Sequence, residues 1–164
     1  LQESRSNDRD VAQDQHFWVV EGLACYMESY RNRDGVITIG DPNFIRFNNA
    51  MVRLISDRFF VRMEVMAELG QVEYQRVPEL PQMYSQASGM VHFFMHANEG
   101  AYRRHLGDHI AAIYSPRSRN EKSIPTLDKL TGKSYKTLNN EYVNYIVRLA
   151  EEVFGGEFSE SASE

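Results

Sequence analysis

The sequence predicts a mainly α-helical protein, a single compact domain of about six helices with little β-structure. Three observations lead to this expectation. Apolar residues recur at intervals of three and four over most of the chain. Short segments that contain Gly or Pro separate these periodic stretches. Only one short run, residues 36–39, is rich in β-branched side chains.

The first expected helix covers residues 16–31 and ends where Asn32-Arg33-Asp34-Gly35 supplies turn residues. Residues 36–39 are expected to form an edge strand or extended segment. Asp41-Pro42-Asn43 then offers a helix N-terminus, and an amphipathic three-and-four spacing runs from Phe44 to Arg58. The first third of the chain is therefore predicted as two helices around a short extended segment.

A short helix is predicted over residues 63–69, ending at Gly70. Residues 71–79 are expected to be extended, because Val77 precedes Pro78 and a residue before proline avoids the helical region. Further helices are predicted over 81–98, 100–114, 125–131 and 138–154. The last is expected to end at Gly155-Gly156.

Residues 1–14 and 155–164 are polar and lack periodicity, so we expect two tails flanking a helical domain over residues 15–154. The polar opening has no starting Met and no apolar core of a signal peptide. We interpret it as a cut inside a longer protein. The sequence therefore indicates no compartment.

Composition excludes two classes of partner. The net charge of -5 argues against a nucleic-acid backbone, which requires a surplus of Lys and Arg. No apolar run approaches the roughly 20 residues of a membrane-spanning helix. Cys25 is the one cysteine, so the chain can form neither an internal disulfide nor an all-cysteine metal site.

Glu21 is the most informative residue, because it is the single ionisable acid in the apolar run 17–27. On a helix its neighbours are mainly apolar, so we expect the carboxylate to be buried. A buried carboxylate requires an arginine, backbone donors or a metal ion. A structural ion pair with a neighbouring helix is the simpler interpretation on physical grounds alone.

Gly22 follows this acid directly. Glycine inside a helix costs about 1 kcal/mol relative to Ala, and a common reason to keep it is close approach of another element. We therefore expect a second element to pack tightly beside Glu21.

The run Trp18-Val19-Val20-Glu21-Gly22-Leu23-Ala24-Cys25-Tyr26 resembles the W-x-x-E-G-x-A-x-Y signature of gluzincin zinc metallopeptidases. In that group this signature carries the third zinc ligand, whereas an HExxH helix supplies two histidines and the general base. The resemblance implies that Glu21 is a zinc ligand. It also implies a hydrolase acting on a peptide or protein substrate.

The resemblance extends along the chain. Residues 81–95 look like the Y-x-Q-A helix of a bacterial gluzincin-like family of unknown function, and residues 127–135 look like the loop before its closing helix. In the wider group a downstream tyrosine hydrogen-bonds the oxyanion of the tetrahedral intermediate. By resemblance Tyr84 takes this role, and a core tyrosine with a satisfied hydroxyl is the alternative.

No HExxH occurs in the 164 residues, so Glu21 alone cannot hold zinc. Either the motif lies upstream of Leu1 or the parent protein never had it. We expect zinc in the full-length protein only, with no cofactor and no hydrolytic activity in this chain alone. The alternative function is a non-catalytic helical module that binds a partner or scaffolds an assembly.

Two histidine pairs could imitate a metal site, since His92 with His96 and His105 with His109 each lie one helical turn apart. The first pair falls on a face that we interpret as a solvated polar face, formed by Ser85, Ser88, Gly89, His92, His96 and Glu99. His109 falls with apolar residues, which predicts a packed core histidine. Neither pair is expected to bind metal.

Overall fold

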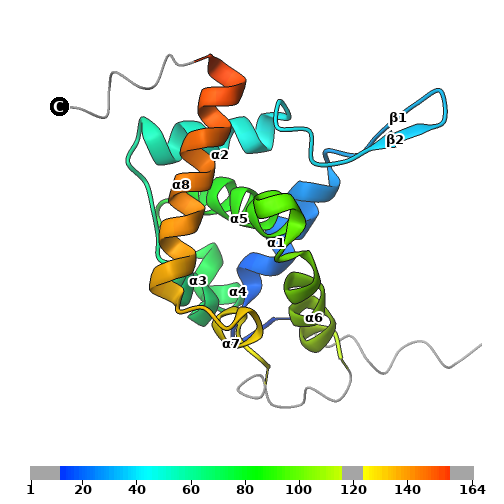
Figure 1. The fold of residues 1–164 in the computed structure, drawn as a ribbon. Helices are drawn as coiled ribbons and strands as arrows, with labels where there is room; N and C mark the ends of the chain where they lie inside the picture. The colour runs from blue at the N-terminus through cyan, green and yellow to red at the C-terminus, as the bar shows by residue number, and fades with distance from the viewer. Residues whose placement is uncertain (1–11, 116–123, 156–164) are drawn as a thin grey trace, which may run out of the picture.

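The computed structural model describes residues 12–115 and 124–155. Within these ranges the chain forms eight α-helices and one two-stranded sheet, so the mainly α prediction is confirmed, with more helices than the expected six or so (Figure 1). In chain order the elements are α1 Phe17–Met27, β1 Arg31–Arg33, β2 Val36–Thr38, α2 Ile45–Ile55, α3 Met63–Glu68, α4 Gln71–Gln75, α5 Leu80–Gly100, α6 Arg103–Ile113, α7 Leu127–Thr131 and α8 Tyr135–Phe154.

Helix α5 is the centre of the fold and crosses the middle of the molecule (Figure 1). It contacts α1, α2, α6 and α8, and most of its side chains up to Phe94 are buried. Gly89 lets two of these neighbours come close, because a Cβ there would lie 2.8 Å from both the Ala50 Cβ on α2 and the Tyr142 hydroxyl on α8. The helix is therefore enclosed on several sides.

Strands β1 and β2 form an antiparallel hairpin that projects from the helical body (Figure 1). Arg33 pairs with Val36 next to the turn, and Arg31 pairs with Thr38 at the open end. The expected helix over 16–31 ends earlier, at Met27, because the chain turns there: the Ser29 hydroxyl donates to the carbonyl of Tyr26 at 2.6 Å. The prediction that residues 36–39 are extended is confirmed over β2. The strand that pairs with β2, β1, was not expected.

The prediction that residues 71–79 are extended is wrong at its start, where α4 forms a short helix. The backbone N–H of Tyr74 donates to the carbonyl of Gly70 at 2.9 Å and closes its first turn. Pro78 restricts only the residue before it, so its effect stops at Val77. A single turn of helix fits between Gly70 and that residue.

Part of the expected N-terminal tail packs on this region. Ala12 is buried, and the carbonyl of Gln13 accepts the backbone N–H of Gln71 at 3.0 Å. The remaining residues of the two expected tails, 1–11 and 156–164, lie outside the described residues. In the part that is described, every helix is too short or too polar to cross a membrane.

Candidate functional site

Glu21 lies in the middle of α1 and is half-buried, with buried neighbours Phe17, Trp18 and Cys25 one turn away on the same helix. Within the described residues its carboxylate makes no ion pair and no hydrogen bond. Burial raises the pKa of this carboxyl group above its ordinary value. The ion pair with a neighbouring helix, which was the simpler interpretation of the sequence, is absent from the described part of the chain.

Gly22 brings α5 directly against this part of α1. A Cβ at this position would lie 2.6 Å from the Ala87 carbonyl oxygen and 2.9 Å from the Val91 Cγ2 atom. Both distances are too short for a side chain, so only glycine fits. The close approach expected from the sequence is confirmed, and it fixes the position of α1 relative to α5.

Tyr84, in the first turns of α5, lies within electrostatic reach of Glu21. Burial raises the pKa of its half-buried phenol, and the negative charges of Glu21 and Cys25 add smaller contributions. The phenol is therefore a neutral hydrogen-bond donor at pH 7. The two residues that the gluzincin resemblance selects thus influence each other electrostatically.

Tyr74, on α4, completes this group and was not expected from the sequence. Its ring packs edge-on against Tyr84 at 5.7 Å between centroids and against Phe17 at 5.5 Å. Its side chain is fully buried, and its hydroxyl has no hydrogen-bond partner among the described residues. Burial, followed by the charges of Tyr84 and Glu21, raises its pKa. The sequence did not indicate that Tyr74 is buried here, because residues 71–79 were expected to be extended.

Glu21, Tyr84 and Tyr74 together offer one ligand for a zinc ion and no more. Glu21 provides a carboxylate oxygen without a competing partner, which suits a single zinc ligand. The orphaned hydroxyl of Tyr74 marks a buried polar atom beside it. The described ranges contain no group of three or more His, Cys, Asp or Glu side chains that could hold a metal ion. Any further ligands would come from elsewhere.

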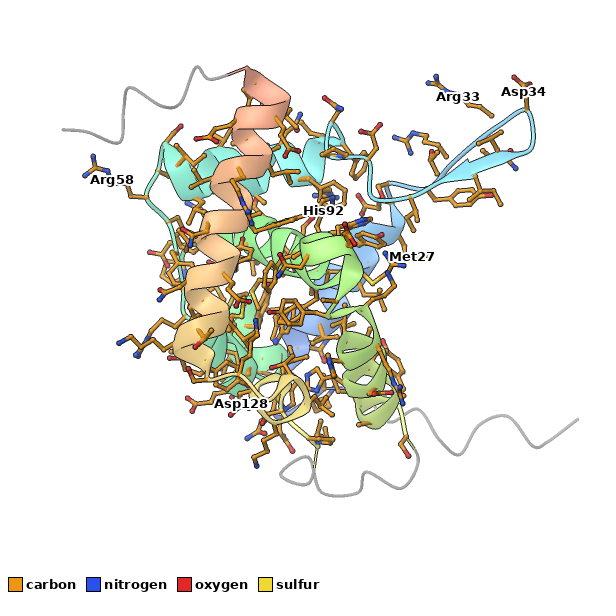
Figure 2. All side chains as sticks on the ribbon, in the orientation of Figure 1. Met27, Arg33, Asp34, Arg58, His92 and Asp128 are labelled. Atoms are coloured by element: carbon orange, nitrogen blue, oxygen red, sulfur yellow. The ribbon has the colours of Figure 1, made fainter. Side chains whose placement is uncertain are left out.

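The interpretation of the first histidine pair as part of a solvated face is wrong for most of that face. Ser88 and His92 are buried, and His92 lies inside the molecule (Figure 2). Its Nε2–H donates to the carbonyl of Gly40 at 3.0 Å, and the Tyr145 hydroxyl donates to its Nδ1 at 2.7 Å. The periodicity of one helix cannot reveal that α2 and α8 cover its polar side.

His96, one turn further on, shares a hydrogen bond with the hydroxyl of Tyr26 at 2.8 Å, and its ring stacks on His92 with 4.5 Å between centroids. Both nitrogens of His92 and the Nε2 of His96 are thus engaged by protein groups. This histidine cluster, formed by His92, His96, Tyr26 and Tyr145, joins α1, α5 and α8 around the base of the hairpin.

His109 is a buried core histidine, as predicted. Its Nδ1–H donates to the carbonyl of Pro125 at 2.8 Å, and its ring packs edge-on against the buried His16 ring at 4.9 Å. His105 is half-buried on α6, one turn before His109. His109 thus links α6 to the start of α1 and to the segment before α7.

Comparison of the chain with models of known protein families, with characterised proteins and with solved structures finds no match.

Proposed function

We propose that this chain is the helical C-terminal part of a zinc-dependent peptidase, in which Glu21 is a zinc ligand and Tyr84 a hydrogen-bond donor to the oxyanion. One observation carries the proposal: a desolvated, half-buried carboxylate with no partner in the described residues lies within electrostatic reach of a neutral phenol. A charge in such an environment requires compensation, and a divalent cation provides it.

Zinc, when bound, would polarise the scissile carbonyl and lower the pKa of a bound water. Glu21 would supply one oxygen ligand, and α1 would hold it rigidly, because Gly22 locks this helix against α5. The Tyr84 phenol would donate to the negative charge that develops on the carbonyl oxygen. Tyr74, packed on Tyr84, would restrict the orientation of that ring.

The two histidine ligands and the general base would lie in a different part of the full-length protein. The 164-residue chain alone would therefore be inactive. The substrate would be a peptide or protein.

Zinc analysis of the full-length protein tests the ligand role. The variant Glu21→Gln should lose bound zinc, whereas Glu28→Gln, a matched change at the C-cap of α1 whose carboxylate pairs with Arg46 at 2.8 Å, should retain it. Tyr84→Phe should keep the zinc and lower kcat by about 10²-fold, the usual cost of one oxyanion donor. Equal zinc content in wild type and Glu21→Gln would remove Glu21 from the site.

A non-catalytic binding module is the second candidate, and the projecting hairpin favours it. All six strand residues are exposed, including Val36 at 65% and Ile37 at 62%. A two-stranded hairpin is marginally stable alone, and its open edges can pair with an extended segment of a partner. A full-length protein that lacks both an HExxH motif and bound zinc would favour this function over the peptidase.

A further inference from the structure

A groove separates the C-terminal end of α5 from the middle of α8. It has a volume of about 510 Å³, within the range of small-molecule sites. Phe93, Ala97 and Asn98 line it from α5, and Asn144, Tyr145 and Arg148 line it from α8. The lining also includes Glu141 and Val147, so amide, hydroxyl, guanidinium and carboxylate groups lie beside one exposed apolar side chain, Val147, while Phe93 and Ala97 are buried beneath them.

The polar groups of α8 share one face because their spacing matches the helical repeat. Asn144, Tyr145 and Arg148 lie three, four and seven residues after Glu141. The exposed side-chain amides of Asn98 and Asn144 form no hydrogen bond within the described residues. These donors are therefore available to a ligand.

The charges around the groove leave one cation without a partner. Glu141 is neutralised by Lys133, whose Nζ lies 2.6 Å from its carboxylate, and the Tyr102 hydroxyl also donates to it. Arg148 has no ion pair among the described residues. Glu152 lines the adjoining hollow with Arg148 but forms no salt bridge with it. The free charge in the groove is thus a guanidinium.

The backbone at the edge of the groove is strained. Helix α5 unwinds at Ala97, and the next two residues, Asn98 with φ 50° and Glu99 with φ 59°, adopt left-handed conformations. Each such residue costs of order 1 kcal/mol or more, and strain of this kind concentrates at ligand sites. Arg103 holds the kink by donating from its guanidinium to the Met95 carbonyl. The kink places Asn98 at the groove.

We propose that this groove binds a small carboxylate with an apolar tail. Arg148 pairs with the carboxylate, and the amides of Asn98 and Asn144 donate to the same group. The tail lies against Val147, the most exposed apolar side chain of the lining. The source of the ligand is a free aliphatic acid or the C-terminal residue of a peptide, which present the same chemistry to the groove.

The test is an NMR titration of the 164-residue chain with hexanoate, as a free acid, and with N-acetyl-leucine, as a peptide C-terminus. Binding of either acid should shift the Asn98 and Asn144 side-chain amide signals and the Arg148 Nε signal in a saturable manner. Hexanamide and N-acetyl-leucinamide, which lack the charge, should bind about tenfold more weakly or not at all. The more tightly bound acid identifies the source.

Two variants separate binding at this groove from a general effect of charge. Arg148→Gln should weaken binding about tenfold, and Asn144→Asp should abolish it by placing a second negative charge at the carboxylate. Arg58→Gln, which removes an exposed arginine from the loop after α2 on another part of the molecule, should leave binding unchanged (Figure 2). Equal shifts with acids and amides, the absence of shifts, or unaltered binding by Arg148→Gln would overturn the proposal.

Discussion

The hydroxyl of Tyr145 donates to Nδ1 of His92 at 2.7 Å across the interface between α8 and α5. The other ring nitrogen of His92 donates to the Gly40 carbonyl, so the imidazole is held in its Nε2–H tautomer. Burial and the neighbouring His96 lower the pKa of His92 from 6.5 to about 4. The fold therefore uses a neutral, fully hydrogen-bonded histidine to connect two helices and the segment that follows the hairpin.

Because buried His92 is held neutral, we expect the chain to lose stability in mild acid. The pKa of His92 is lower in the folded chain than in the unfolded chain, so the unfolded chain takes up the proton first as the pH falls. His92 should therefore cost the fold about 3 kcal/mol as the pH falls from 6.5 through 4. His16, whose pKa burial and His109 lower to about 4, adds a comparable loss over the same range.

Urea unfolding at a series of pH values measures this effect, and NMR titration of the imidazole signals assigns it. The signals of His92 and His16 in the folded chain should titrate near pH 4. A free energy of unfolding that stays constant from pH 7 to pH 4 would contradict the predicted role of both buried rings.

Tyr145→Phe tests the hydrogen bond itself. It removes one hydroxyl and leaves Nδ1 of a buried imidazole without a donor, which should destabilise the chain by about 1–3 kcal/mol. Tyr30→Phe, which changes an exposed tyrosine, should alter stability by less than about 0.5 kcal/mol. Thermal unfolding at pH 7 compares the two variants. Equal midpoints would show that Tyr145 contributes packing alone.

The sequence allowed the helical class to be predicted because the apolar periodicity of α2 and α8 is local information. It also indicated the close contact at Gly22, because glycine in a helix has a known cost. Strand β1 pairs locally with β2, but its residues are polar and were assigned to the end of the first helix and to the turn. The burial of His92 depends on residues distant in the chain, which no local pattern contains. The position of Tyr74 was missed for the same reason, since its neighbours come from α1 and α5.

Gly22→Ala should destabilise the chain by about 1–3 kcal/mol, because the new methyl group meets the Ala87 carbonyl oxygen at 2.6 Å and α1 must move away from α5. Gly107→Ala is the matched control on α6, where a Cβ meets nothing within 4 Å. This control should stabilise the chain by up to about 1 kcal/mol through higher helix propensity. Stabilisation by both changes in urea unfolding would contradict the close approach of α1 and α5.

Glu21→Gln should slightly stabilise the isolated chain at neutral pH. Burial raises the pKa of this carboxyl group in the folded state, so its stabilising contribution is complete below the unfolded pKa and is lost as the pH rises through the folded pKa. The ionised carboxylate therefore opposes folding at pH 7, and the amide removes that cost. The gain should stay below about 1 kcal/mol, because Glu21 is partly exposed and solvent screens its charge.

The comparison of wild type and Glu21→Gln by urea unfolding should show this gain at pH 7 and none at pH 3. In the full-length protein with zinc the order should reverse, since a ligand that binds the folded state stabilises it and the variant loses that ligand. Such a reversal is expected of a residue kept for function at the expense of stability. If Glu21→Gln is instead destabilising in the isolated chain at pH 7, the carboxylate has a stabilising partner and its role is structural.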